Sequence, residues 1–442
     1  MYKKIYLLLL LLGFVFCLKS FSQTVDQSTA YQHAMSFIQE RGFSMSINNG
    51  KAYRSPGVNA SDNAGHFYFY NSTDGNGYVI VSGDEDANPI IGYSDTGNVD
   101  PDNLPDGLKA LLTHYTEELT RLHQIGAEKE VLDESVNGPR RVMSIARYPI
   151  KPFLKRNWSQ NSPFKSNCPV IRDTLCNPGC AAIAIAEVIA QYNFPDSIGD
   201  IVSYKTSEKE VIPALPGYKI QWKYILDSYL YGSPTTEQKS EVSKFIRYVS
   251  QATKADYVPS GTTGTLNVVP SFLRNLGYNC SAYTSLASRT IRSWENILYQ
   301  ELEAGRPVIM DAQTLSQSAH AFVCDGYDQD DYYHIDWGWD GHCQGYFRLS
   351  ALSPYYNIDE YAYNDNLYII YGIYPNLTPE PDPDDGGSGT EPGGDDGGSG
   401  TEPGGDDGGS GTEPGGDDGG SGTEPGGDDN GGDDNGGDDN GG

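Results

Sequence analysis

A cysteine at the start of an apolar segment is the residue of this sequence best placed for chemistry. Cys180 follows the turn-forming sequence Asn-Pro-Gly, and no Gly or Pro interrupts residues 181–193. The small and apolar side chains of this segment predict a helix that is buried on nearly every face. In the first turn of a helix, unpaired backbone N–H groups and the helix dipole favour an anion, so we expect a lowered pKa for the Cys180 thiol. Cys180 is therefore a candidate nucleophile, with a buried structural cysteine or half of a disulfide as the alternative.

Three histidines follow Cys180 in the chain and are candidates for its base. His342 lies in a Gly-rich turn, and His334 lies inside a strand-like stretch. His320 begins the strand HAFVCDGY directly after the polar loop SQSA, which places its ring at the end of a strand. Taken alone, each of these histidines is more often structural than catalytic.

An acidic residue in the next strand makes His320 the favoured base. If the chain turns near residues 329–331, the strands that carry His320 and Asp336 are antiparallel, and the two side chains come within reach. A thiol, an imidazole and an orienting carboxylate form the set that nucleophilic catalysis by cysteine requires. Trp337 would cover the contact between His320 and Asp336 and exclude water from it, with plain core packing as the alternative.

The elements that must position these residues fall into two groups along residues 148–375. Helices are expected first, at 181–193, 236–253, 268–276 and 293–304. Strand-like stretches follow, with the sequences RPVIMDA, HAFVCDGYD, DYYHIDWGW and GYFRLSAL. This order predicts an α+β domain in which a helical half faces a twisted antiparallel β half.

The chain before this domain divides into a targeting segment and a small α+β segment. Residues 1–22 combine Lys3 and Lys4, an apolar run and small residues, which predicts a signal peptide and a secreted protein. Residues 23–143 contain expected helices at 28–41 and 105–124 and two hairpin-like strands. The pattern is lost in residues 131–147, where we expect an exposed linker that proteases can cut.

The end of the chain, residues 377–442, repeats the unit GGSGTEPGGDD and predicts a disordered acidic tail. Residues 380–439 carry 20 acidic and no basic side chains, out of a net charge of −30 for the chain. The rest of the chain is therefore only mildly acidic, and without a basic patch we expect no nucleic-acid partner. The seven histidines are scattered and no CxxC pair occurs, so we predict no metal and no cofactor.

Several of these motifs resemble a known family when taken in order. The sequences NWSQNSP, NPGCAAIAIAEVIAQYNFP, HAFVCDGYD, YYHIDWGWDG and GYFRLSALSP are similar to those of streptopain-like cysteine peptidases, family C10, a branch of the papain-like fold. The resemblance implies Cys180 as nucleophile, His320 as base and Gln160 as the side-chain donor of an oxyanion hole. Residues 23–143 are similar to the inhibitory prosegment of the same family. The family usually has Asn where this chain has Asp336, and an ionised Asp336 would raise the pKa of the His320 imidazole.

These observations predict a secreted cysteine endopeptidase that is made as a zymogen and cleaves proteins or peptides. Its expected parts are a signal peptide (1–22), an inhibitory prosegment (23–143), a papain-like domain (144–376) and a disordered tail (377–442). The prosegment is expected to act as an intramolecular inhibitor, and no membrane span is expected after the signal peptide.

Two other functions remain open at this point. A transglutaminase-type acyltransferase uses a similar Cys–His–Asp order, although the WSQ motif and the prosegment favour hydrolysis. A secreted binding protein without catalysis is the second alternative, and the set of Cys180, His320 and Gln160 argues against it.

Six cysteines follow residue 22, and Cys168 and Cys176 are close enough in sequence to pair.

Overall fold

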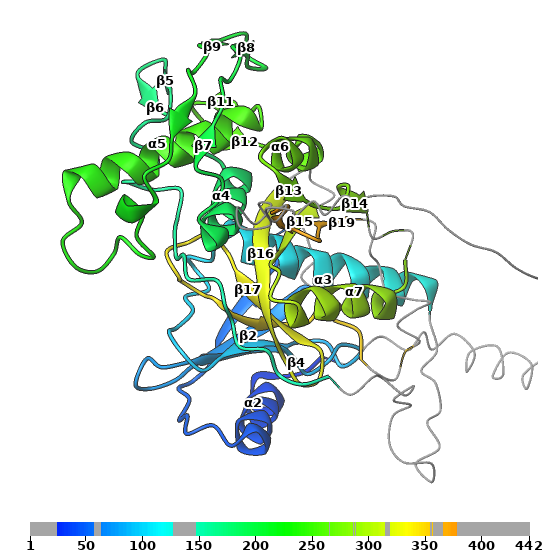
Figure 1. The fold of residues 1–442 in the computed structure, drawn as a ribbon. Helices are drawn as coiled ribbons and strands as arrows, with labels where there is room; N and C mark the ends of the chain where they lie inside the picture. Colours follow the sequence, from blue (N-terminus) through cyan, green and yellow to red (C-terminus); the bar gives the residue numbers. More distant parts are fainter. Residues whose placement is uncertain are drawn as a thin grey trace, which may run out of the picture. The chain divides into compact units, whose positions relative to one another are not determined.

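The computed structural model describes residues 24–56, 63–126, 147–264, 266–285, 287, 289–313, 319–353, 356 and 366–377 (Figure 1). The chain divides into two units, Met1–Thr378 and Pro379–Gly442, and every described residue lies in the first. The predicted signal peptide, nearly all of the predicted linker and the predicted tail beyond Leu377 lie outside the described residues. The domain boundaries expected from the sequence therefore remain predictions.

The described residues of the N-terminal segment form two helices and four strands. They are α2 (Gln27–Arg41), β1 (Lys51–Arg54), β2 (His66–Asn71), β3 (Tyr78–Ser82), β4 (Ile90–Ser94) and α3 (Asp106–Ile125). Asp26 caps α2 by accepting a hydrogen bond from the backbone N–H of Thr29 at 2.7 Å, and Gly42 ends the helix with a φ of 67°. Both helices and the β2–β3 hairpin lie close to the ranges predicted from the sequence.

The catalytic part begins with helices and ends with strands, as predicted. Its helices are α4 (Cys180–Tyr192), α5 (Thr236–Ala252), α6 (Val269–Asn275) and α7 (Ile291–Glu303). Thr235 and Gln238 form a capping box at the start of α5. The long strands are β15 (Val308–Gln313), β16 (Ala319–Asp328) and β17 (Tyr332–Asp336), with the shorter β14 (Thr284–Ser285), β18 (Gly345–Phe347) and β19 (Leu367–Ile370).

Smaller elements connect the helices. They are β5 (Val170–Ile171), β6 (Thr174–Leu175), β7 (Ser197–Ile198), β8 (Tyr204–Lys205), β9 (Val211–Ile212), β10 (Tyr218–Lys219), β11 (Asp256–Val258), β12 (Gly261–Thr263), β13 (Tyr278–Asn279), β20 (Tyr374–Pro375) and the 3₁₀ turns Trp222–Tyr224 and Leu266–Val268. They form two-stranded sheets, such as β5 with β6.

A single antiparallel sheet runs through the N-terminal segment and the catalytic part. Its ten strands lie in the order β1-β2-β3-β4-β18-β17-β16-β15-β19-β14. The junction is β4 with β18, where Tyr93 pairs with Tyr346 and Gly92 with Phe347. The sequence predicted a separate N-terminal segment, but its sheet continues the catalytic sheet.

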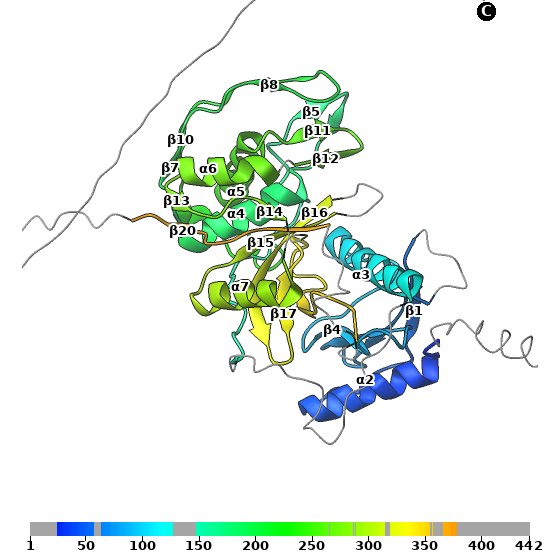
Figure 2. The same ribbon diagram turned by 90° about the vertical axis from the view of Figure 1, so that its right-hand side faces the viewer.

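The two faces of the sheet pack against different helices, which can be followed in Figure 1 and Figure 2. Ala321 and Val323 of β16 belong to a core that contains residues of α4, α5 and α6. Phe322 and Cys324 belong to a second core, which contains residues of α3 and α7. Successive side chains of a strand alternate between faces, so β16 separates the α4 side from the α3 side.

The fold is therefore α+β, as predicted, with helices packed on both faces of one antiparallel sheet. Cys168, Cys176, Cys180, Cys280, Cys324 and Cys343 are all free thiols in the described part, and no disulfide joins Cys168 to Cys176 there. Of the helices formed by the described residues, none is long and apolar enough to cross a membrane.

Candidate active site

Cys180 is the first residue of the buried helix α4, and the turn before it is held from two sides. Gly179 takes a φ of 90°, which favours glycine. The hydroxyl of Ser250 donates to the carbonyl oxygen of Pro178 at 2.7 Å, and the hydroxyl of Thr262 donates to that of Asn177 at 2.6 Å. The residues from Ala181 to Ala190 are all buried, so the helix cannot shift without opening the core.

The Cys180 thiol points to the start of β16. Its Sγ accepts a hydrogen bond from the backbone N–H of Ala321 at 3.4 Å. Burial raises the pKa of the Cys180 thiol, although the N–H groups of Ala321, Ala181 and Cys180 itself act in the opposite direction, and the charge of Asp311 raises it further. The lowered pKa expected from the helix N-terminus is thus not found, because desolvation outweighs the backbone donors in this form of the protein.

His320 precedes Ala321 and lies next to the first turns of α3. Burial lowers the pKa of its imidazole, the carboxylates of Asp106 and Asp311 act to raise it, and Lys109 lowers it. Asp106 and Lys109 both belong to α3. Strand alternation puts the His320 side chain on the same face as Phe322, which packs on the α3 side. His320 and Cys180 are therefore neighbours along the strand, but no hydrogen bond joins their side chains among the described residues.

The structure does not bring Asp336 to His320, so the contact predicted from the hairpin is not formed here. The turn lies where it was predicted, since Asp328 pairs with Tyr332. A β-bulge between Cys324 and Gly326 then shifts the register by one residue, and Asp336 lies opposite Val323. A shift of one residue moves a side chain to the other face of a sheet. Asp336 therefore shares the α4 side with Val323.

The Asp336 carboxyl is bound within its own turn. Its Oδ1 accepts a hydrogen bond from the backbone N–H of Gly338 at 2.9 Å, and the side chain is 2% exposed. Burial raises its pKa to about 6, with the charge of Asp325 adding to the effect while Gly338, Gln344 and His334 oppose it. At neutral pH this buried carboxyl is close to the point where it takes up a proton.

Trp337 packs between the catalytic sheet and α3. Its ring lies 5.0 Å from that of Phe322 and 5.1 Å from that of Phe347, measured between centroids. Its indole N–H donates to the carbonyl oxygen of Cys343 at 2.7 Å. Gly107 of α3 lies so close that a Cβ atom placed on it would be 2.8 Å from the indole ring. In this form the Trp337 ring packs against α3, and it does not cover a bond between His320 and Asp336.

Gln160 lies half-buried in a loop that is tied to α4. The backbone N–H of Trp158 donates to Glu187 of α4 at 2.9 Å, and the Trp158 indole N–H donates to Leu226 at 3.0 Å. Lys165, further along the loop, contacts Asn177 just before Cys180 at 3.3 Å. These contacts fix the loop beside the N-terminal half of α4.

Two buried acidic residues were missed by the sequence analysis, one beside Cys180 and one beside His334. The charge of Asp311 acts to raise the pKa of both the Cys180 thiol and the His320 imidazole. An oxygen of Asp325 lies 2.6 Å from Nδ1 of His334. Both acidic residues are almost fully buried. The available signal was a single acidic residue within an otherwise apolar strand, as in RPVIMDA for Asp311.

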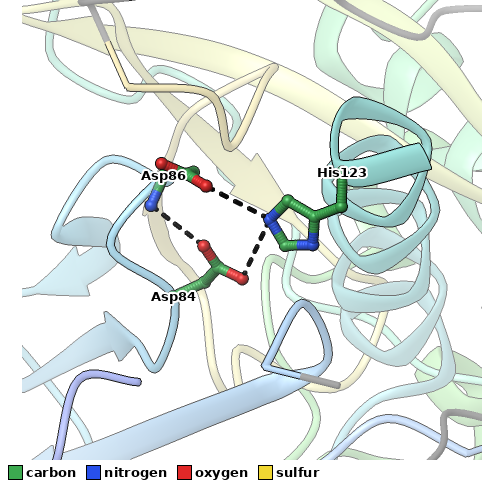
Figure 3. A group of neighbouring side chains, drawn as sticks. All are labelled: Asp84, Asp86 and His123. Atoms are coloured by element: carbon green, nitrogen blue, oxygen red, sulfur yellow. Dashed lines mark hydrogen bonds and ion pairs between the residues drawn. The ribbon is translucent and has the colours of Figure 1, made fainter. Parts of the chain in front are cut away.

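One group in the described part of the chain has the composition of a metal site. The ligand atoms of Asp84, Asp86 and His123 lie within 4.8 Å of one another (Figure 3). Nε2 of His123 is 3.4 Å from an oxygen of each carboxylate, so a protonated imidazole offsets one of their two negative charges. The group lies in the N-terminal segment, where α3 meets the loop between β3 and β4. It supplies no group to the surroundings of Cys180.

Cys180 at the start of a buried helix, facing the strand that begins near His320, is the arrangement of a papain-like cysteine peptidase. Helix α3 of the N-terminal segment covers the side of β16 that carries His320. Residues 158–347 match the Peptidase C10 family, and residues 22–119 match the Spi protease inhibitor family. Residues 158–347 thus form a cysteine peptidase domain of the streptopain-like C10 family, preceded by an inhibitor-type prosegment.

Individual relatives agree with this assignment. Streptopain of Streptococcus pyogenes serotype M28 is 28% identical over 309 residues, which are 65% of this chain and 75% of that protein. The thiol protease/hemagglutinin PrtT of Porphyromonas gingivalis is 25% identical over 371 residues, 79% of this chain and 42% of that protein. A fragment of Prevotella intermedia prointerpain A has the same fold, with a TM-score of 0.57 at 20% identity, covering 74% of this chain and 99% of the fragment.

Proposed function

We propose that this protein is a secreted cysteine endopeptidase made as a zymogen, with Cys180 as nucleophile and His320 as general base. The observation that supports this most directly is the hydrogen bond from the Ala321 backbone to Cys180 Sγ, at 3.4 Å. This hydrogen bond makes Ala321, the residue that follows His320, a direct neighbour of the Cys180 thiol. The His320 side chain lies on the α3 side of β16, so we propose that it moves to the Cys180 side when α3 is removed.

The proposed chemistry follows from these positions. His320 takes the proton of Cys180, and the thiolate attacks the carbonyl carbon of the scissile peptide bond. The resulting oxyanion is stabilised by the backbone N–H of Cys180 and the side-chain amide of Gln160. His320 then protonates the leaving amine, and water hydrolyses the acyl-enzyme to regenerate the thiol. For Asp336 to orient the His320 ring, as the sequence predicted, the ring must move from the α3 side of the sheet to the α4 side in the processed enzyme.

Latency is proposed to come from α3. This helix adds Asp106 and Lys109 to the surroundings of His320 and places Gly107 against Trp337. Both residues are half-buried, and desolvation raises the pKa of the Cys180 thiol and lowers that of the His320 imidazole, so both groups favour their neutral forms. Removal of residues 23–143 by a cut between about 131 and 147 would expose both groups to solvent and substrate. The acidic tail is not part of this mechanism.

Replacing the nucleophile tests the proposal. Purified Cys180→Ala precursor is expected to cleave no peptide and to stay near full length, as seen by mass spectrometry. Cys280→Ala is the matched control, because Cys280 is a half-buried thiol that donates to the carbonyl oxygen of Pro270 at 3.6 Å. The control should process and cleave as the unmodified protein does. Normal self-processing of Cys180→Ala without another protease would refute the proposal, and incorporation of amines without peptide cleavage would favour an acyltransferase.

A further inference from the structure

A buried carboxylate beside Cys180 takes no part in the chemistry proposed above. Asp311 lies in β15 and is 3% exposed. Its Oδ2 accepts hydrogen bonds from the hydroxyl of Tyr283 at 2.5 Å and from the side-chain amide of Gln313 at 3.0 Å. Its Oδ1 is shielded from solvent and makes no hydrogen bond within the described part of the chain. A buried carboxylate oxygen without a donor is costly and is a sign of a missing partner.

The register of the sheet places Asp311 on the cysteine side. Asp311 pairs with Ala321, whose N–H donates to Cys180 Sγ. Ile309, two residues before Asp311, belongs to the core that contains α4, so the two side chains share that face. The charge of Asp311 also acts on the Cys180 thiol. Asp311 thus lies one strand away from the thiol and on the same side of the sheet.

Two tyrosines border the carboxylate. Tyr368 of β19 pairs with Asp311 on the side away from Ala321. Its ring is stacked on that of Tyr283, with 4.7 Å between the centroids and 12° between the planes. Both tyrosines are only half-buried. A carboxylate next to aromatic faces suits a guanidinium or ammonium group, which gains an ion pair and a cation–π contact together.

A purely structural role explains the position of Asp311 less well. Two donors already serve its Oδ2, and an amide at this position would keep both contacts without a buried charge. Asp311 also shares no hydrogen bond with His320 among the described residues, so it does not hold that ring. What remains is the unsatisfied oxygen, which lies one strand away from the Cys180 thiol and on the same side of the sheet.

We propose that Asp311 is a specificity-determining residue that binds the basic side chain, Arg or Lys, of a substrate residue close to the scissile bond. This inference rests on the proposed function, since it requires that peptides bind beside Cys180. The cationic side chain supplies the donor that Oδ1 lacks, and an acidic side chain at the same place is repelled. A site with an unpaired polar group discriminates strongly against a ligand that leaves the group unpaired.

The test uses the full chain after its own processing, with active sites counted by a thiol-directed titrant. Its substrates are pairs of peptides that are identical except at one residue, which is Arg in one peptide and its neutral isostere citrulline in the other. Separate pairs vary the two positions on either side of the cleaved bond. At one position we expect kcat/KM to be about 30-fold or more higher for Arg. Asp311→Asn should lower the value for Arg by a similar factor and change that for citrulline by less than about threefold. Asp256→Asn is the control, because Asp256 only accepts the backbone N–H of Ser207, on another sheet.

The outcomes separate the two proposals. Equal rates for Arg and citrulline at every position in the unmodified enzyme overturn the inference and leave the peptidase intact. An equal loss for both peptides in Asp311→Asn shows a structural role and also overturns it. If the unmodified enzyme cleaves neither peptide at any position, the proposed function fails and this inference fails with it. Should Asp311→Asn not fold, the ratio in the unmodified enzyme alone decides.

Discussion

Gly107 in the first turn of α3 lies against the indole ring of Trp337, at the point where the prosegment meets the catalytic sheet. A Cβ atom at this position would be 2.8 Å from one indole carbon and 3.6 Å from the ring of Phe322. No side chain fits there without moving Trp337 or α3. The absence of a side chain at residue 107 thus allows the helix to approach His320.

This contact predicts that a side chain at residue 107 weakens latency. Gly107→Val should destabilise the packing of α3 by about 1–3 kcal/mol, the usual cost of overpacking a core. We expect the precursor to process several-fold faster, which gel analysis over time measures. Gly199→Ala is the control, since a Cβ atom at Gly199 meets nothing within 4 Å. Unchanged or slower processing of Gly107→Val would show that the α3–Trp337 contact does not maintain latency.

The second prediction concerns Asp336 and stability. Because burial raises its folded-state pKa to about 6, ionisation of this carboxyl costs stability as the pH rises from about 4 to about 6. Asp336→Asn keeps an oxygen for the Gly338 N–H and removes the charge. It should be about 2 kcal/mol more stable than the unmodified protein at pH 7, and little different at pH 4. Denaturant unfolding of the Cys180→Ala precursor at both pH values measures this, and a difference that does not depend on pH would contradict it.

The third prediction concerns Asp336 and activity. Asp336→Asn should keep the processed enzyme active, with a shifted pH profile, because an amide still orients His320. Asp336→Ala should lower kcat/KM by about 100-fold, because nothing then holds the ring. The pH profiles of both variants on one peptide provide the comparison. If Asn and Ala behave alike, Asp336 has no orienting role and the His320 ring is held by another group.

The fourth prediction concerns the group of Asp84, Asp86 and His123. Burial opposes protonation of His123, but the two carboxylates outweigh it and raise its pKa to about 10. The resulting stability is fully present below the ordinary pKa of about 6.5 and is lost as the pH rises through about 10. His123→Gln should therefore destabilise the precursor by about 1.5 kcal/mol at pH 6, and by much less at pH 10.5.

Two controls show whether a proton on His123 is what stabilises this group. His33→Gln should cause no such loss at either pH, because burial lowers the pKa of His33, so a proton on this ring does not stabilise the fold. A chelator should leave the unmodified precursor unchanged. Loss of stability on chelation would show that a bound metal, and not a proton, holds the two carboxylates together.

The sequence was sufficient for the elements that depend on local pattern. The run of small apolar residues after Cys180 predicted α4 because it is rich in Ala and is too long, at 13 residues without Gly or Pro, for a typical buried strand. The alternation around His320 and the turn near residue 330 predicted the β16–β17 hairpin.

Other features depend on distant contacts and were beyond local pattern. The bulge between Cys324 and Gly326 moves Asp336 to the opposite face, and a single Gly in a strand is its only trace in the sequence. The direction of the Cys180 pKa shift is set by how deeply the thiol is covered. The β4–β18 pairing joins residues about 250 positions apart through two Cα pairs, too few to leave a pattern.

The central claim is that Cys180 is the nucleophile and that the prosegment blocks it. A peptide with a thiol-reactive epoxide, added to the precursor and to the processed enzyme at pH 7, followed by mass spectrometry of the digested protein, tests both parts at once. Cys180→Ala supplies a precursor that cannot process, and an uncleavable linker variant with Cys180 intact supplies the blocked form. We predict one adduct, on Cys180, formed rapidly in the processed enzyme and at least about 100-fold more slowly in the blocked form. Equal labelling of both forms, or labelling of another cysteine with loss of activity, would contradict the claim.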